Sequence, residues 1–163
     1  MTMTDRFRHW YNHERDANAK CLAMLASVPE ENRSHPYYQR ALDKMAHLVS
    51  ARHRWLHRIG VLPAQPELFP QGTKLSDLPA LVESIENAWV QFLNTLDDSQ
   101  LGRKFEYTAM DGKRLRWDLE GALTQTNGHA WYHRGQIAML VAELGGKAVD
   151  TDYVFFHRPE VVS

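Results

Sequence analysis

The amino-acid sequence predicts an all-α protein, a four-helix bundle with a short hairpin or other extended excursion before its last helix. Four stretches of about 20 residues repeat their apolar positions at steps of three and four, the period of an amphipathic helix. Outside these stretches, no long segment alternates apolar and polar residues as a strand does. The chain has 163 residues, enough for one domain with a substantial core, so we expect a single domain over residues 1–163.

The first two helices are expected over residues 4–27 and from Ser34 to Gly60. In the second helix, Ser34 would act as the cap residue, Pro36 would lie in the first turn, and Gly60 would end the helix. The residues expected to face the core are Phe7, Trp10, Tyr11, Asn18, Cys21, Leu22 and Leu25 in the first helix, and Tyr38, Ala41, Leu42, Met45, Leu48, Val49, Arg52, Leu56 and Ile59 in the second.

A long connection is expected over residues 61–74, which are rich in proline and glycine. Ser76 is then expected to cap the third helix, whose first turn tolerates Pro79. The apolar stripe of this helix consists of Leu78, Leu81, Val82, Ile85, Trp89, Phe92, Leu93 and Leu96.

The helical period is lost after the third helix. Two short runs, residues 105–108 and 114–117, flank the dipeptide Asp111–Gly112. An Asp-Gly pair between such runs is typical of a tight turn, so a short hairpin or extended excursion is expected here.

The fourth helix is expected over residues 119–144, because Gly145 follows its last apolar residue. The aromatic tail over residues 150–157 is expected to be one extended segment packed on the bundle. The stripe of the fourth helix consists of Leu119, Ala122, Leu123, Thr126, Ala130, Ile137, Leu140, Val141 and Leu144.

Composition narrows the function classes. The formal net charge is −1, from 19 basic and 20 acidic residues, so charge gives no support for a nucleic-acid or membrane partner. The single cysteine, Cys21, excludes an internal disulfide and a cysteine-rich zinc site. The first residues contain no apolar signal core, and no apolar run is long enough to span a membrane, so a cytoplasmic protein is expected. Histidine, with nine residues, is the one residue type present in excess of an ordinary composition, and it indicates metal or proton chemistry.

Three histidine pairs have the spacing of four residues that places both rings on one helical face: His9/His13, His53/His57 and His129/His133. The first pair lies well off its stripe and is expected to be solvated. The second pair flanks its stripe and is a weaker candidate for metal binding. The third pair lies inside the stripe, where buried imidazoles need partners, either a metal ion or neighbouring polar groups of the core.

Two imidazoles do not complete a metal site, which typically has about three protein ligands when one position stays open. No glutamate follows His129, so the general base of the zinc-peptidase helix motif is missing. A third ligand must come from another helix. Stripe geometry alone favours His53 and places His47 on the surface.

The pattern His129-x-x-x-His133-Arg134-Gly135-Gln136, with His47 eight residues before Trp55, resembles the DinB-like (DinB/YfiT) family. That resemblance implies a four-helix bundle that binds a divalent metal through three histidines, and it assigns His47, His129 and His133 as the ligands. It also makes a homodimer plausible. Gln136 lies on the same helical face as the two histidines of the fourth helix, either as a partner of a ligand or as an exposed side chain.

Three neutral imidazoles suit zinc, nickel, iron or cobalt, and they do not select one of them. The expected function is that of a metal-dependent thiol S-transferase or thiol-dependent isomerase, in which a metal-bound thiolate or water is the reactive group. The resemblance favours a small-molecule substrate, with a low-molecular-weight thiol as one candidate. The alternatives are a metal-dependent hydrolase and a non-catalytic, stress-associated metal-binding protein. No catalytic side chain is identified from the sequence.

Overall fold

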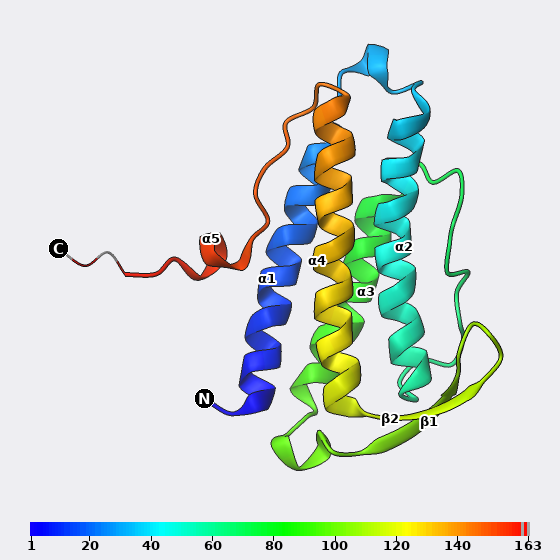
Figure 1. Cartoon of the computed structure of the whole chain (residues 1–163), viewed down its shortest axis with the longest axis vertical. Helices are drawn as coiled ribbons and strands as arrows, with labels where there is room; N and C mark the ends of the chain where they lie inside the picture. Colours follow the sequence, from blue (N-terminus) through cyan, green and yellow to red (C-terminus); the bar gives the residue numbers. More distant parts are fainter. Residues whose placement is uncertain (161, 163) are drawn as a thin grey trace.

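The computed structural model describes residues 1–160 and 162, and it is mostly helical, as predicted. Four long helices lie side by side, and a small two-stranded sheet lies at one end of them (Figure 1). A fifth, short helix follows near the C-terminus. The elements are α1 (Met3–Ala26), α2 (Pro36–Arg58), α3 (Leu78–Asn94), β1 (Lys104–Thr108), β2 (Arg114–Asp118), α4 (Leu119–Glu143) and α5 (Tyr153–His157), with 3-10 helices at Glu30–Asn32 and Asp98–Gln100.

The two strands form the predicted hairpin. They pair antiparallel, with Phe105 opposite Trp117. Gly112 adopts a φ of 84° in the connecting turn, a conformation that glycine reaches without a steric penalty. No helix in the described part of the chain is both long enough and apolar enough to cross a membrane.

Two of the predicted helix caps are wrong. The helix α2 is capped by His35, whose Nδ1 accepts a hydrogen bond from the backbone N–H of Tyr37 at 3.2 Å, and not by Ser34. Because Pro36 is already the first helical residue, the cap must be the residue directly before it. The cap of α3 is Asp77, not Ser76. Asp77 is already in the helical region of backbone conformation, and its side chain does not accept a hydrogen bond from the helix.

The core consists of two apolar clusters stacked along the helices. One contains Met24, Leu25, Met45, Ile137 and Leu140, and the other is built around large side chains of α1, α2, α3 and α4. Most of the predicted stripe residues are buried, but Leu81 is 44% exposed and Trp10 and Leu22 are half-buried. The second cluster consists of Phe7, Tyr11, Leu56, Ile59, Ile85, Trp89, Phe92, Leu93, Leu96, Leu101, Leu119 and Leu123.

A buried ion pair lies between the two clusters. Glu14 of α1 and Arg52 of α2 are only 3% and 5% exposed, and their side chains form a salt bridge. The Arg52 guanidinium lies 5.1 Å from the centre of the Trp89 ring, and the Trp89 indole N–H donates to the Arg52 backbone carbonyl at 3.2 Å. The ion pair, the cation–π contact and the indole hydrogen bond together join α1, α2 and α3. Each of the three contacts requires a specific distance and orientation of its groups.

The C-terminal tail packs on α1, but not as one extended segment. Residues 153–157 form α5, whose aromatic side chains cover His9 and His13. The prediction that these two histidines are solvated is therefore wrong. His13 is 1% exposed, and its Nε2 is hydrogen-bonded to the Thr151 carbonyl at 2.8 Å. The periodicity of α1 gave no sign of this burial, because the covering residues are far away in the sequence.

We expect Glu14→Gln to lower the free energy of unfolding by about 3–5 kcal/mol, because it leaves the buried Arg52 cation without a counter-charge. Urea unfolding followed by circular dichroism measures this loss. A double variant, Glu14→Leu with Arg52→Met, should recover much of it, since no charge then remains buried. As a control, Arg116→Gln removes an exposed ion pair of the hairpin and should change stability little. Equal effects of Glu14→Gln and Arg116→Gln would contradict the role given to the buried pair.

Candidate metal centre

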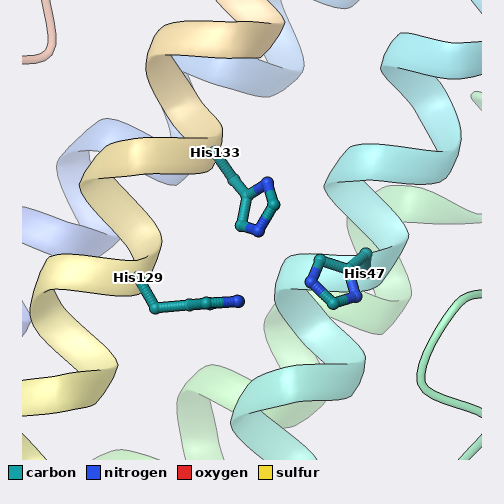
Figure 2. A group of neighbouring side chains, drawn as sticks. All are labelled: His47, His129 and His133. Carbon is teal, nitrogen blue, oxygen red and sulfur yellow. The ribbon is translucent and has the colours of Figure 1, made fainter.

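Three histidines meet between α2 and α4. His47 comes from α2, and His129 and His133 come from α4; one ring nitrogen of each lies within 4.8 Å of the others. The distances between ring centres are 5.2 Å for His47 and His129, 4.7 Å for His47 and His133, and 4.5 Å for His129 and His133. Figure 2 shows the three imidazoles pointing toward one another from the two helices.

The structure brings in His47 rather than His53. His47 is 7% exposed, so the stripe-based expectation of a surface residue is wrong, and His53 is not part of the cluster. The reason is that α2 packs against α3 on one side and against α4 on another, so that it has two buried faces. The row containing His47, Ala51 and Trp55 forms the face toward α4. His57, the other histidine of that pair, is not part of the cluster either. Its Nδ1 is hydrogen-bonded to the Leu62 carbonyl at 3.0 Å, near the end of α2.

Hydrogen bonds hold two of the rings in a form suited to metal binding. The Nδ1 of His47 lies 2.6 Å from the Leu68 carbonyl oxygen, which can only accept, so Nδ1 carries the hydrogen. The Nδ1 of His133 lies 2.9 Å from the Gln136 side-chain oxygen, which also accepts from the Lys44 ammonium at 2.8 Å. In its neutral form each ring then has its lone pair on Nε2, the nitrogen that can bind a cation. The sequence allowed two roles for Gln136, a partner of a ligand or an exposed side chain. The structure places it as the hydrogen-bond partner of His133.

Burial keeps the α4 histidines neutral at physiological pH. It lowers the pKa of His129 to about 4, and the neighbouring His133 and His47 contribute further in the same direction. The pKa of His133 is also lowered by burial, against the opposing effect of its hydrogen bond to Gln136. A neutral imidazole is the form that binds a metal ion, so at pH 7 little proton competition is expected at these two rings.

The histidines open onto a cavity of about 310 Å³. Its walls come from α2, α4, the tip of the hairpin and the connection between α2 and α3, which runs along α2 (Figure 1). Within the described residues, no aspartate, glutamate or cysteine lines it. The lining residues are His47, Ala51, Arg54, Trp55, Arg58, Leu68, Phe69, Met110, Gln125, His129 and His133.

Sequence reasoning missed the part of the site supplied by the connection. Phe69 stacks on His47, with ring centres 4.8 Å apart and planes 7° apart, and Leu68 supplies the carbonyl that orients the same imidazole. These residues belong to an irregular segment without periodicity, so no sequence pattern predicted their role.

A second cavity of about 440 Å³ shares His47, His133 and Phe69 and is lined further by residues of α2 such as Arg40.

The donor set fits a divalent metal ion. Three neutral imidazole nitrogens close together match the preferences of zinc, nickel, iron and cobalt. Among residues 1–160 and 162, no fourth histidine, cysteine, aspartate or glutamate joins the cluster. Cys21 does not contribute, since it is fully buried elsewhere in the core and burial raises the pKa of its thiol to about 11. A site with three protein ligands leaves room for a further ligand from solution.

The fold and the cluster define the class of this chain, a mostly helical protein with three histidines that could hold a metal ion. The model of the DinB family matches residues 2–161, nearly the whole sequence. The chain therefore belongs to the DinB family, and the resemblance found in its histidine pattern is confirmed. A search of curated proteins and a search of solved structures each returned no match.

We expect the untagged wild-type protein to retain about one divalent ion per chain, and the variants His47→Ala, His129→Ala and His133→Ala to lose most of it, because two imidazoles bind far more weakly than three. Elemental analysis after dialysis measures the content. His53→Ala, on the same helix as His47, is the matched control and should retain the ion. Retention by His47→Ala together with loss by His53→Ala would overturn the assignment of the third ligand.

In the metal-free protein, the free energy of unfolding should fall as the pH is lowered from about 7 to about 4. The unfolded histidine takes up a proton near pH 6.5, whereas folded His129 stays neutral until about pH 4, so acid favours the unfolded state across this window. Urea unfolding at several pH values should show a steeper decline for the wild type than for His129→Gln. An identical pH dependence of the two proteins would contradict the lowered pKa.

Proposed function

We propose that this protein is a metal-dependent enzyme of the DinB family, a thiol S-transferase or thiol-dependent isomerase, with His47, His129 and His133 as the metal ligands. One observation carries the proposal: three imidazoles face a cavity that is lined by no other histidine, cysteine, aspartate or glutamate among the described residues. A closed set of four ligands would instead suit a structural metal. The metal itself is proposed to be zinc, nickel, iron or cobalt.

The chemistry of the cavity favours a thiol over water as the nucleophile. A divalent ion held by the three histidines would act as a Lewis acid and lower the pKa of a thiol or water beside it. A free thiol has a pKa of about 8.5, against 15.7 for water, so a thiol needs only a small shift to ionise at neutral pH. No described carboxylate lines this cavity to act as a general base for water, and Asp43 of the adjoining cavity accepts hydrogen bonds from the Thr73 backbone N–H and the Gln39 side chain.

The walls of the cavity suit an electrophile with an apolar body. Trp55, Leu68, Phe69 and Met110 supply apolar surface beside the histidines, which would hold such a substrate and exclude competing water. In the proposed transfer, the thiolate sulfur forms a bond to an electrophilic carbon while the leaving group departs with the bonding electron pair. In the isomerase version, the thiol adds and is later eliminated.

We also propose that the four long helices form the four-helix bundle that the sequence predicts, and that residues 1–163 are a single domain. The pairwise packing of α1 with α3 and α4, and of α2 with α3 and α4, supports this arrangement. The resemblance to the wider family supports a small-molecule substrate for the cavity between α2 and α4.

The test is a panel of small thiols offered with chlorodinitrobenzene, whose conjugation changes the absorbance. We expect at least one thiol to give a metal-dependent rate, and His129→Ala to lower that rate by about 100-fold or more, since a Lewis acid contributes several kcal/mol to such steps. His53→Ala should keep the wild-type rate.

Two outcomes would overturn the transferase proposal. Metal-dependent cleavage of nitrophenyl esters without any thiol-dependent rate would favour the hydrolase. Stoichiometric metal with neither activity, and a fourth protein ligand detected by X-ray absorption at the metal, would favour a non-catalytic metal-binding protein.

A further inference from the structure

Two arginines share the cavity with the histidine cluster. Arg54 and Arg58 follow His47 on α2 by seven and eleven residues, and both line the same cavity of about 310 Å³. At 100° per residue, they lie within roughly 20° of His47 around the helix axis, one on either side. The three side chains thus form a column along one face of α2, with the histidine at one end and the arginines toward the other.

Neither guanidinium has a counter-charge in the described part of the chain. The Nε atoms of Arg54 and Arg58 are buried without a hydrogen-bond partner. Burial lowers the pKa of Arg58, and the positive charge of Arg54 adds to this effect. Two neighbouring, partly buried cations repel one another, so an anion placed between them would relieve that repulsion.

The position of Arg58 is fixed by aromatic rings rather than by an acid. Its guanidinium carbon lies 4.7 Å from the centre of the Trp55 ring and 4.4 Å from that of Tyr107 on β1. Cation–π contacts use the flat face of the guanidinium and leave its N–H groups at the edge free to donate. Such a guanidinium is preorganised for a planar or tetrahedral oxyanion.

Several arginines elsewhere in the described part of the chain are paired with carboxylates. Arg52, on the opposite side of α2, is paired with the buried Glu14. Arg114 and Arg116 on the hairpin both bind Glu106. The buried Arg134 also lacks a carboxylate, but it contacts Asn18 in the core, whereas Arg54 and Arg58 line the cavity beside the histidines.

We propose that Arg54 and Arg58 form a binding subsite for an oxyanion of the substrate, a carboxylate or a tetrahedral acid group. This subsite rests on the proposed function. The thiol or its electrophile is anionic and spans the cavity, with its reacting end at the histidines and its oxyanion at the arginines. Each oxyanion oxygen accepts N–H donors from the guanidinium edges. The distance between the histidine cluster and the arginine pair then selects substrates whose reacting atom and oxyanion are separated by a matching length.

A structural role for these arginines makes a different prediction. Arg58 lies in the last turn of α2, where a cation stabilises the helix dipole. Removal of that effect would lower stability, but it would not change the preference between charged and neutral ligands. Selectivity for the anion is thus the quantity to measure.

The experiment uses the full chain loaded with cobalt, whose visible spectrum changes when a thiolate binds. Three probes of similar size are titrated: mercaptopropionate, mercaptoethanesulfonate and the neutral mercaptopropanol. We expect the wild type to bind at least one charged probe about 10-fold more tightly than mercaptopropanol, as charge-assisted hydrogen bonds do. Arg54→Gln and Arg58→Gln should each abolish most of this preference while leaving mercaptopropanol within roughly 3-fold of its wild-type affinity.

Arg40→Gln is the matched control, because Arg40 lies on the same helix and lines only the neighbouring cavity. It should keep the preference for the charged probe. Equal affinity of the wild type for charged and neutral probes would overturn the proposal, and so would loss of the preference in Arg40→Gln alone. The comparison of carboxylate with sulfonate identifies which oxyanion the pair accepts.

A second measurement separates this proposal from the proposed function. If no thiol perturbs the cobalt spectrum, the thiol chemistry fails, and the arginine subsite is judged by saturation-transfer NMR with benzoate and benzyl alcohol. Benzoate binding that is stronger than benzyl alcohol binding, and that is lost in Arg54→Gln and Arg58→Gln, supports the subsite. Equal binding of the two probes overturns it.

Discussion

The placement of the site depends on the buried ion pair between Glu14 and Arg52. A charge in the core has few acceptable positions, because every displacement leaves it without its partner. The pair, together with the hydrogen bond from the Trp89 indole to the Arg52 carbonyl, fixes how α2 is rotated between α1 and α3. His47 lies five residues before Arg52 on the same helix. A rotation of α2 by even one residue, about 100°, would turn His47 away from α4.

Once α2 is fixed, the electrostatics of the site follow from what surrounds it. His47 is buried and the two α4 histidines are half-buried, and burial favours the neutral form of the α4 rings, as the lowered pKa values of His129 and His133 show. Arg54 and Arg58 line the cavity beside them without a described carboxylate, while the adjoining cavity is lined by both Lys44 and Asp43. A bound divalent ion would add to this positive potential. Such a site attracts anions, and both proposed ligands are anions: a thiolate at the metal ion and an oxyanion at the arginine pair.

The sequence could predict features that depend on local pattern and could not predict those that depend on distant segments. His129 and His133 were found because they are spaced by four residues and lie beside the apolar stripe read from the sequence of α4, and the hairpin was found from Asp111–Gly112. His47 was missed by periodicity because α2 is buried on two faces; only the family pattern pointed to it. His13 was misplaced because the C-terminal tail covers it. The oxygens that orient the rings, from Leu68 and Gln136, required the folded positions of a loop and of side chains.

The two faces of α2 explain why one helix carries arginines with opposite roles. Arg52 faces α1, where Glu14 neutralises it, so it serves the stability of the core. Arg54 and Arg58 line the cavity together with His47 and the small side chain of Ala51. No described carboxylate is paired with either arginine there. Partial burial of two neighbouring cations costs some free energy, and apolar or neutral residues would avoid that cost at both positions. A chain that retains two such cations next to a three-histidine cluster is best explained by a ligand that brings the missing negative charge with it.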